Sequence, residues 1–185
     1  MKINKNGFWE ENNFDRHSVD DILCNSLIEF FKDNYTESII DIGCGTGYYT
    51  KRLKEHFDCD GYDGNPYTEE LTNGLCKVLD FTKPTEFAKK YDAVLCLEVV
   101  EHIPKELEFN FLDNIFNIFP EVIVLSWAIH GQGGDGHINE QPNDYVISVM
   151  EKNGYQYSEK ESLKIREVCN LWWFKNTLMV FYKNQ

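Results

Sequence analysis

Three glycines lie within five residues of one another in the segment Asp41-Ile-Gly43-Cys44-Gly45-Thr-Gly47, and this spacing restricts the folds open to the chain. The short apolar segment 38–42 leads into the glycines, and residues 48–56, of helical composition, follow them. Glycine adopts positive φ without strain and lets backbone N–H groups approach a ligand with no Cβ in the way. The segment is therefore predicted to be a strand, a ligand-binding turn and a helix.

Strands and helices are predicted to alternate along most of the chain. Further apolar runs predict strands at residues 58–62, 76–79, 91–97 and 121–127. Helical patterns are present at residues 18–31, 84–90 and 106–119, the first of them opening with Ser18 as a capping residue. Strands that are apolar throughout, such as residues 93–97, are typical of a parallel sheet covered on both faces. Open α/β sheets of this kind bind ligands beyond the carboxyl ends of their strands.

The last part of the chain has a different pattern. A loop at residues 130–143 precedes a helix at 144–152 and two strand-like segments, 155–168 and 171–182, which we expect to pair as an antiparallel terminal hairpin. No repeat, low-complexity tract or linker divides the 185 residues. We therefore expect one domain, residues 1–185, with an N-terminal segment and helix (1–37), a ligand-binding core (38–130) and a loop, helix and hairpin (131–185).

Charge and composition exclude some classes of protein. The chain has 18 Lys+Arg and 31 Asp+Glu, and the resulting formal charge of −13 opposes an encounter with DNA or RNA. Neither a leader-like apolar segment nor a run of 18 uncharged apolar residues is present, so we expect a cytoplasmic protein without a membrane partner. The six cysteines form no CxxC pair, which favours reduced, buried thiols.

The glycine turn differs from a dinucleotide-binding fingerprint. That fingerprint requires G-x-G-x-x-G/A, whereas Tyr48 occupies the third glycine position after Gly43 and Gly45. Asp41 directly before the turn would repel a pyrophosphate and attract an ammonium or sulfonium group. The turn therefore indicates a nucleoside ligand that carries a cation rather than NAD.

A second segment, Leu97-Glu98-Val-Val-Glu101-His102-Ile-Pro104, follows the predicted strand 91–97. Together with Asp-Ile-Gly-Cys-Gly-Thr-Gly it resembles class I S-adenosylmethionine-dependent methyltransferases over residues 38–130. The resemblance implies an α/β, Rossmann-like, seven-stranded and mostly parallel sheet with helices on both faces and an antiparallel last strand. It also implies S-adenosyl-L-methionine as methyl donor and S-adenosyl-L-homocysteine as product.

The resemblance implies a role for several residues in binding the donor. Asp41 and the glycine turn would line the methionine moiety, Asp63 the ribose, and Leu97 and Glu98 the methionine end. Asp80 would receive the adenine amino group, with Phe81 beside the ring, and His102 would pack near the turn. The donor site expected in this way comprises Asp41, Gly43, Cys44, Gly45, Asp63, Gly64, Asp80, Phe81, Leu97, Glu98 and His102.

Candidate catalytic residues lie in the loop Ser126-Trp-Ala-Ile-His130-Gly-Gln-Gly-Gly-Asp135-Gly-His137-Ile-Asn139-Glu140-Gln141. Four glycines within six residues make this loop pliable, and its His, Asp, Asn and Gln side chains are unsuited to a core. We expect His137 to be the general base, with His130 as the second candidate and Asp135 as the carboxylate that orients it. No metal site is expected, because Asp135, His137 and Glu140 are crowded within six residues of one loop.

Four more residues are candidates for contact with the acceptor. Trp9 and His17, in the aromatic segment before the first helix, could cover the donor and exclude water. Trp127, at the end of a predicted strand, could stack on a ring, and Arg166, on the predicted hairpin, could meet a phosphate.

Three functions remain open from the sequence. The first is methyl transfer to a small polar molecule, at an oxygen of a sugar or sugar phosphate, because the Gly-Gln-Gly-Gly-Asp-Gly-His stretch resembles small methyltransferases of bacterial surface-glycan biosynthesis. The second is methylation of a protein or peptide side chain, and the third is an inactive donor-binding partner subunit. We expect a monomer or a homodimer.

Overall fold

A computed structural model describes residues 2–13, 15 and 17–184 of the chain. Its strands are β1 (Ser38–Ile42), β2 (Asp58–Asp63), β3 (Cys76–Val78), β4 (Ala93–Leu97), β5 (Val122–Ser126), β6 (Tyr155–Tyr157) and β7 (Met179–Lys183). Its helices are α1 (Asp21–Asp33), α2 (Tyr48–Leu53), α3 (Thr68–Leu71), the 3₁₀ turn η1 (Val100–His102), α4 (Lys105–Asn117), α5 (Asn143–Lys152), α6 (Glu159–Val168) and α7 (Trp172–Thr177).

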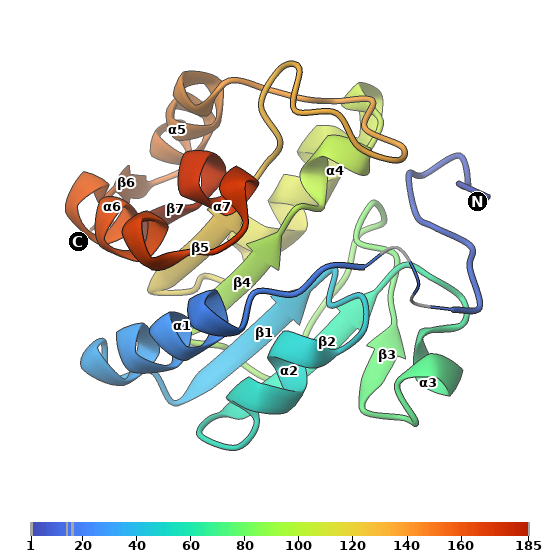
Figure 1. Cartoon of the computed structure of the whole chain (residues 1–185), viewed down its shortest axis with the longest axis horizontal. Helices are drawn as coiled ribbons and strands as arrows, with labels where there is room; N and C mark the ends of the chain where they lie inside the picture. The colour runs from blue at the N-terminus through green and yellow to red at the C-terminus, as the bar shows by residue number, and fades with distance from the viewer. Residues whose placement is uncertain (1, 14, 16, 185) are drawn as a thin grey trace.

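The strands form one seven-stranded sheet in the order β3-β2-β1-β4-β5-β7-β6 (Figure 1). Neighbouring strands are parallel from β3 to β5, and β7 is antiparallel to both β5 and β6. The order reverses between β1 and β4, which is the position where open α/β sheets bind ligands. The structure therefore confirms the predicted mostly parallel sheet with an antiparallel last strand.

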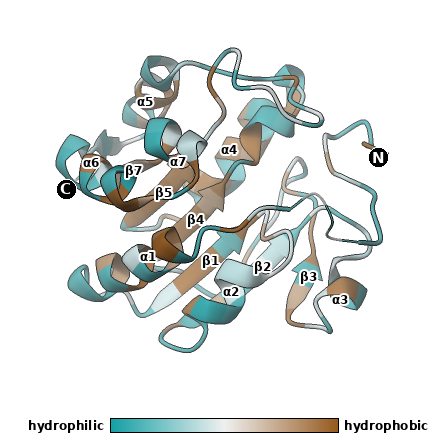
Figure 2. Cartoon of the chain, viewed as in Figure 1, coloured by the Kyte–Doolittle hydropathy of each residue, from teal (hydrophilic) through white to brown (hydrophobic). Residues whose placement is uncertain are grey.

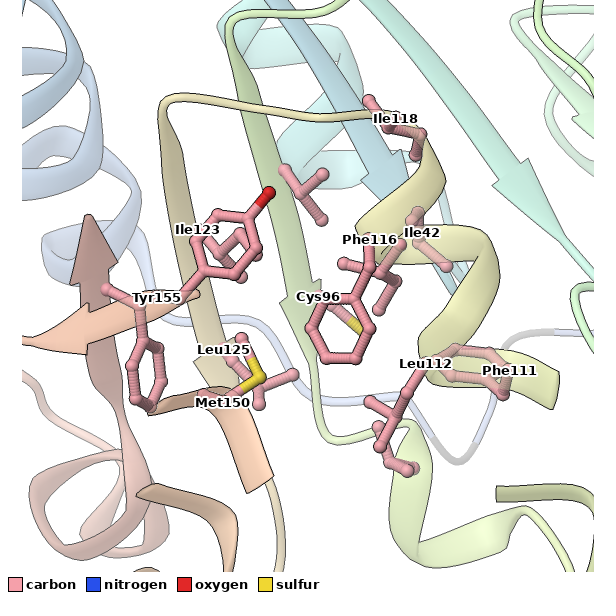
Figure 3. Packing of buried hydrophobic residues seen from close by; sticks show 14 of the residues in the cluster. Ile42, Cys96, Phe111, Leu112, Phe116, Ile118, Ile123, Leu125, Met150 and Tyr155 are labelled. Carbon is pink, nitrogen blue, oxygen red and sulfur yellow. The ribbon is translucent and has the colours of Figure 1, made fainter. Parts of the chain in front are cut away.

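Alternate residues of the central strands pack into two separate cores. On one face Ile40, Val94 and Ile123 contact helices α4 and α5, and Figure 3 shows part of this cluster. On the other face Ile39, Leu95 and Val124 belong to a cluster with α1, α2, α6 and α7. Figure 2 shows the hydrophobic colour concentrated on the central strands, as expected where both faces of a sheet are covered by helices.

Helix α1 begins later than the sequence predicts. Its N-cap is Asp20 rather than Ser18, and one Asp20 carboxylate oxygen accepts the N–H groups of Ile22 and Leu23. The second oxygen accepts the N–H groups of Asn170 and Leu171 at 2.6 and 2.8 Å. The capping carboxylate therefore also ties the first helix to the segment before α7, a contact that no local pattern encodes.

Residues 84–90 do not form the predicted helix. The side chain of Asn114 accepts the N–H of Thr85 and donates to the carbonyl oxygens of Phe81 and Lys83. These backbone groups are thus paired with a buried side chain of α4 instead of with one another, and the segment remains an irregular connection.

The predicted terminal hairpin is wrong in two respects: no tight turn connects its strands, and most of the residues assigned to the strands are not in a strand. Only residues 155–157 and 179–183 are strands, and helices α6 and α7 lie between them. The α6 sequence is rich in Glu, Lys, Leu and Arg, which are good helix formers. Strands β6 and β7 still pair antiparallel, so the edge of the sheet is as predicted although no tight turn joins the two strands.

Two further features bear on the environment of the chain. All six cysteines are buried free thiols. In the part of the chain that the structure describes, no helix combines the length and the apolar composition needed to cross a membrane.

Candidate active site

A cavity of about 380 Å³ opens at the carboxyl ends of β1, β2 and β4. Its wall combines the N-terminal segment, the glycine turn, the residues after β2 and β4, the loop after β5 and helix α7. The predicted site residues in this wall are Trp9, His17, Asp41, Gly43, Cys44, Gly45, Asp63, Gly64, Phe81, Leu97, Glu98, His102, Asp135 and His137. Most of the donor site expected from the sequence is therefore gathered around one space.

Each glycine of the turn adopts a conformation that favours glycine. The φ angles of Gly43, Gly45 and Gly47 are 73°, 51° and 71°. A Cβ on Gly43 would also lie only 2.3 Å from Cγ2 of Val99. The turn needs glycine for its backbone conformation and, at Gly43, for close packing against the segment after β4.

Asp63 joins the end of β2 to the turn. One of its carboxylate oxygens accepts the N–H of Gly45 at 2.9 Å, and the other accepts the N–H of Asn65 at 2.8 Å. A carboxylate oxygen has capacity for more than one hydrogen bond, so Asp63 can still accept hydroxyl groups of a ligand in the cavity. This geometry fits the expected role of Asp63 toward a ribose.

Asp41 is almost fully buried at the end of β1 and accepts a hydrogen bond of 2.6 Å from the Thr50 hydroxyl. Burial raises the pKa of Asp41 to about 7, while the hydrogen bond from Thr50 opposes this shift and the charge of Asp63 adds to it. A cation in the cavity would favour the ionised form. The environment of Asp41 thus fits the positively charged donor that the turn indicates.

Glu98 follows β4 with φ of 54°, an uncommon conformation for a residue with a side chain. Its N–H donates to the Ser126 hydroxyl at 2.9 Å, and its carboxylate accepts hydrogen bonds from Gln132 at 2.5 Å and Thr177 at 3.3 Å. Burial raises the pKa of Glu98. The sequence predicted Glu98, but Gln132 and Thr177, which hold it, were not identified because they come from distant segments.

Glu140 holds the His137 ring. Nδ1 of His137 lies 3.2 Å from a Glu140 carboxylate oxygen, and Glu140 also accepts the N–H groups of Gly131 and Gly133 at 2.7 and 2.8 Å. Burial alone would raise the pKa of Glu140, but the two N–H groups and the His137 ring outweigh it and lower the pKa. The sequence-based role of an orienting carboxylate, assigned to Asp135, thus falls to Glu140, and Asp135 lies exposed in the cavity wall.

Aromatic rings connect the N-terminal segment to His137. The ring centroids of Trp9 and His17 lie 5.2 Å apart, those of Trp9 and His102 5.6 Å, and those of His102 and His137 4.9 Å. Burial and the neighbouring His137 lower the pKa of His102 to about 4, so His102 is neutral near pH 7. Trp9 and His17 of the N-terminal aromatic segment therefore form part of the cavity wall.

Four predicted site residues do not line the cavity. Arg166 is on α6 and donates to the carbonyl oxygen of Leu178, so it is not available to an acceptor phosphate in the cavity. Trp127 is fully buried and donates to the carbonyl oxygen of Asn139 at 2.6 Å, so it cannot stack on a ligand.

The other two are Asp80 and His130. Asp80 interacts with Asn6, Thr82 and Lys83 instead of facing the cavity. His130 is exposed at the start of its loop and lies outside the cavity wall. A position directly after a strand does not by itself place a side chain in the site, because the path of the following backbone decides its direction.

Helix α7 contributes residues to the cavity wall that were not expected there together, because the segment 171–182 was predicted to be a strand. Trp172, Trp173 and Phe174 line the cavity, and 52% of the surface of Trp172 is exposed. In a strand, adjacent side chains would point to opposite faces of the sheet, whereas α7 brings all three residues to the cavity wall. Phe8, which also lines the cavity, was missed because its contact with Gly64 depends on the folded N-terminal segment.

Comparison with known proteins is consistent with this site. The family described as "Methyltransferase domain" matches residues 16–160. The chain is 28% identical over 157 residues to the ubiquinone biosynthesis O-methyltransferase of Rickettsia bellii, and the match covers 77% of this chain and 65% of that protein. The chain thus spans somewhat less than two thirds of the length of this relative.

Two solved structures share the fold. The sugar N-methyltransferase KedS8 from Streptoalloteichus sp ATCC 53650 has a TM-score of 0.70 and 15% identity, with 89% of this chain and 88% of that chain covered. The magnesium protoporphyrin IX methyltransferase from Synechocystis PCC 6803, crystallised with bound SAM, has a TM-score of 0.64 and 14% identity, with 87% and 78% covered. The chain belongs to the methyltransferase-domain family and has the fold of class I S-adenosylmethionine-dependent methyltransferases.

Proposed function

We propose that this enzyme methylates a hydroxyl oxygen of a small, uncharged ring compound such as a sugar or a phenol. The observation that carries the proposal is that Glu98, His102 and His137 line the same cavity as the glycine turn and the aromatic side chains of Trp9 and Trp172. The donor supplies a methyl group that is already activated as a sulfonium. The protein must therefore mainly orient the acceptor and assist the loss of its proton.

An oxygen acceptor is supported by the chemistry of the cavity wall. A hydroxyl has a high pKa, and its methylation needs a group that takes up or displaces the proton. The carboxylate of Glu98 and the imidazole of His137 provide this function in the cavity wall. The relative from Rickettsia bellii is also named as an O-methyltransferase.

A small and uncharged acceptor is supported by the size and charge of the cavity. About 380 Å³ lies in the usual range for small-molecule pockets. Among the described residues of its wall there is no lysine or arginine, so the phosphate of a sugar phosphate would have no basic partner there. Exposed aromatic rings such as Trp172 favour stacking on a sugar or phenol ring.

Binding and turnover experiments test the proposal in two steps. Isothermal titration with S-adenosylhomocysteine and with NAD should show binding of the first alone. Mass spectrometry should then detect the gain of one methyl group by a member of a panel of sugars, phenols, sugar phosphates and basic peptides. Exclusive methylation of peptides, or binding of the donor without methylation of any panel member, would contradict the proposal.

A variant of His137 tests the role of the loop. The His137→Gln enzyme should bind S-adenosylhomocysteine normally and lose a factor of about 10²–10⁴ in kcat, the usual contribution of a group that assists proton loss. His56→Gln is the matched control, because His56 is exposed and remote from the cavity wall. An unchanged kcat in His137→Gln would remove His137 from the proposed site.

A further inference from the structure

Three side chains with metal-binding atoms come together beside the cavity. Glu101 and His102 belong to η1, which follows β4, and His137 belongs to the loop after β5. One ligand atom from each residue lies within 4.8 Å of the other two. His102 and His137 also line the cavity, so the group is accessible from the proposed acceptor site.

Glu101 has little compensation for its buried carboxylate, because the backbone N–H groups of Glu101 and Ala128 approach it without normal hydrogen-bond geometry. Its exposure is 0%, and neither carboxylate oxygen accepts a hydrogen bond of normal geometry from the described residues. Among those residues, the nearest side chain that can carry a positive charge is His137, whose Nε2 lies 3.9 Å from a Glu101 oxygen. A buried carboxylate without a partner is costly, whereas coordination to a cation would satisfy both its charge and its lone pairs.

Glu140 sets the orientation of the His137 ring for metal binding. A carboxylate only accepts hydrogen bonds, so the proton of the neutral ring lies on Nδ1, which is 3.2 Å from Glu140. The lone pair of His137 is then on Nε2, the nitrogen that faces Glu101. A carboxylate behind the distal nitrogen of a histidine ligand is the usual arrangement of metal-bound histidines.

The loop that carries His137 is attached to η1 by its backbone. The N–H groups of Ile138 and Asn139 donate to the carbonyl oxygen of Glu101 at 3.0 and 2.9 Å. The sequence disfavoured a metal site because Asp135, His137 and Glu140 are crowded in one loop. The structure instead combines a loop residue with two residues of a separate, buried segment.

We infer that Glu101, His102 and His137 bind one divalent transition-metal ion of the first row, such as Mn²⁺, Co²⁺ or Zn²⁺. Two imidazoles and one carboxylate are a ligand set that these ions prefer over Mg²⁺ or Ca²⁺. Three ligand atoms at about 2.1 Å from one ion in a tetrahedral arrangement lie about 3.4 Å from one another, so ligand atoms that are now up to 4.8 Å apart must approach by up to about 1.4 Å.

The function of such an ion follows from its position, and this step depends on the proposed O-methylation. An ion held by three protein ligands would keep free coordination positions, and two of its ligands, His102 and His137, line the cavity that would hold the acceptor. A divalent cation lowers the pKa of a hydroxyl that reaches it. The hydroxyl proton passes to the Glu98 carboxylate, the oxygen forms the new C–O bond, and the S–CH₃ bond breaks with its electron pair left on sulfur.

Metal titration of the whole chain tests this inference without any acceptor. The wild-type enzyme is treated with a chelator, dialysed and titrated with Co²⁺, Mn²⁺ and Mg²⁺. We expect one Co²⁺ per chain with a visible absorption band, similar saturation by Mn²⁺, and weaker binding of Mg²⁺. Absence of saturable one-to-one binding of Co²⁺ and Mn²⁺ at millimolar concentration would overturn the inference.

Variants localise the site. Glu101→Gln and His137→Gln should each weaken Co²⁺ binding at least tenfold, whereas the exposed-residue controls Glu151→Gln and His56→Gln should bind as wild type does. Circular dichroism and binding of S-adenosylhomocysteine verify folding, and His137→Gln, in a partly exposed loop, serves if the buried Glu101→Gln does not fold. Unchanged Co²⁺ affinity in the folded variants would contradict the assigned ligands.

Metal binding and methylation of a hydroxyl acceptor are measured separately, so one proposal can fail while the other holds. Metal binding without methylation of any hydroxyl compound would support the site and contradict the proposed function. Methylation at an undiminished rate in the presence of chelator, with no metal bound, would support the proposed function and overturn the metal site.

Discussion

Nδ1 of His137 lies 3.2 Å from the carboxylate of Glu140, and this contact directs Nε2 of His137 toward Glu101. Glu140 is held in turn by the N–H groups of Gly131 and Gly133. The glycine-rich loop is therefore not only a pliable connection. Its backbone fixes a carboxylate, and the carboxylate fixes the histidine that we place beside the acceptor.

We expect Glu140→Gln to lower kcat about tenfold, because an amide cannot accept all three hydrogen bonds and its NH₂ group would face N–H donors. The KM for the donor should change little, since Glu140 does not line the cavity. Steady-state kinetics measures both parameters, with Glu151→Gln as the exposed control. A change in donor KM at constant kcat would contradict the positioning role.

We expect Asp63→Asn to weaken binding of S-adenosylhomocysteine about 10- to 100-fold, because one carboxylate oxygen becomes an NH₂ group facing a backbone N–H or a ligand hydroxyl. Isothermal titration measures the affinity. The control is Asp113→Asn on the exposed side of α4, which should bind as wild type does. Equal affinity of both variants would show that Asp63 does not contact the donor.

Asp41 should make stability depend on pH. Its pKa is raised to about 7, so between about pH 4 and 7 the folded protein retains a proton that the unfolded chain has released. The free energy of unfolding therefore falls as pH rises through this window, by at most about 1.4 kcal/mol per pH unit from this one group.

The Asp41→Asn variant cannot ionise at this position and should lose that part of the pH dependence. Urea unfolding of both proteins without ligand between pH 4 and 8 measures the difference. We expect the variant to gain stability relative to wild type as pH rises from 4 to 7. A difference that is independent of pH would show that Asp41 ionises normally.

Gly43 and Gly154 both have positive φ, so alanine variants at these two positions distinguish the energetic cost of backbone strain from the cost of a steric clash. An alanine at Gly154 meets no atom within 4 Å, so Gly154→Ala should cost only the strain of its φ of 88°, about 1 kcal/mol. Gly43→Ala adds a Cβ at 2.3 Å from Val99 and should cost at least about 1 kcal/mol more. Chemical denaturation measures both costs, and Val99→Ala in the Gly43→Ala background should recover part of the loss.

Trp127→Phe tests the structural role that the fold gives this residue. The variant loses the hydrogen bond to the carbonyl oxygen of Asn139, so we expect a loss of about 1–3 kcal/mol in the free energy of unfolding. Denaturant titration measures it. If Trp127 instead stacked on the acceptor, the acceptor KM would rise and stability would remain unchanged.

Local sequence patterns determined the parallel core and the donor side of the cavity. The apolar runs and the glycine turn are patterns of a few residues. The family resemblance carried by the turn and by the segment after β4 implied that Asp41, Gly43, Asp63 and Glu98 share one site, and all four line the cavity. The strand pattern failed at residues 159–177, where helices α6 and α7 lie between the two edge strands. In this segment the composition favours a helix and the apolar pattern favours a strand. Packing against the sheet determines which of the two forms.

Only the tertiary structure decided the acceptor side. The contact of Glu140 with His137 lies within one loop, but the approach of that loop to Glu101 depends on backbone hydrogen bonds between segments far apart in the chain. The same holds for Gln132 and Thr177 at Glu98 and for the exclusion of Arg166 from the cavity. Spacing in a sequence determines which side chains share a strand or a turn, whereas contacts between separate loops are set by how the loops pack at the edge of the sheet.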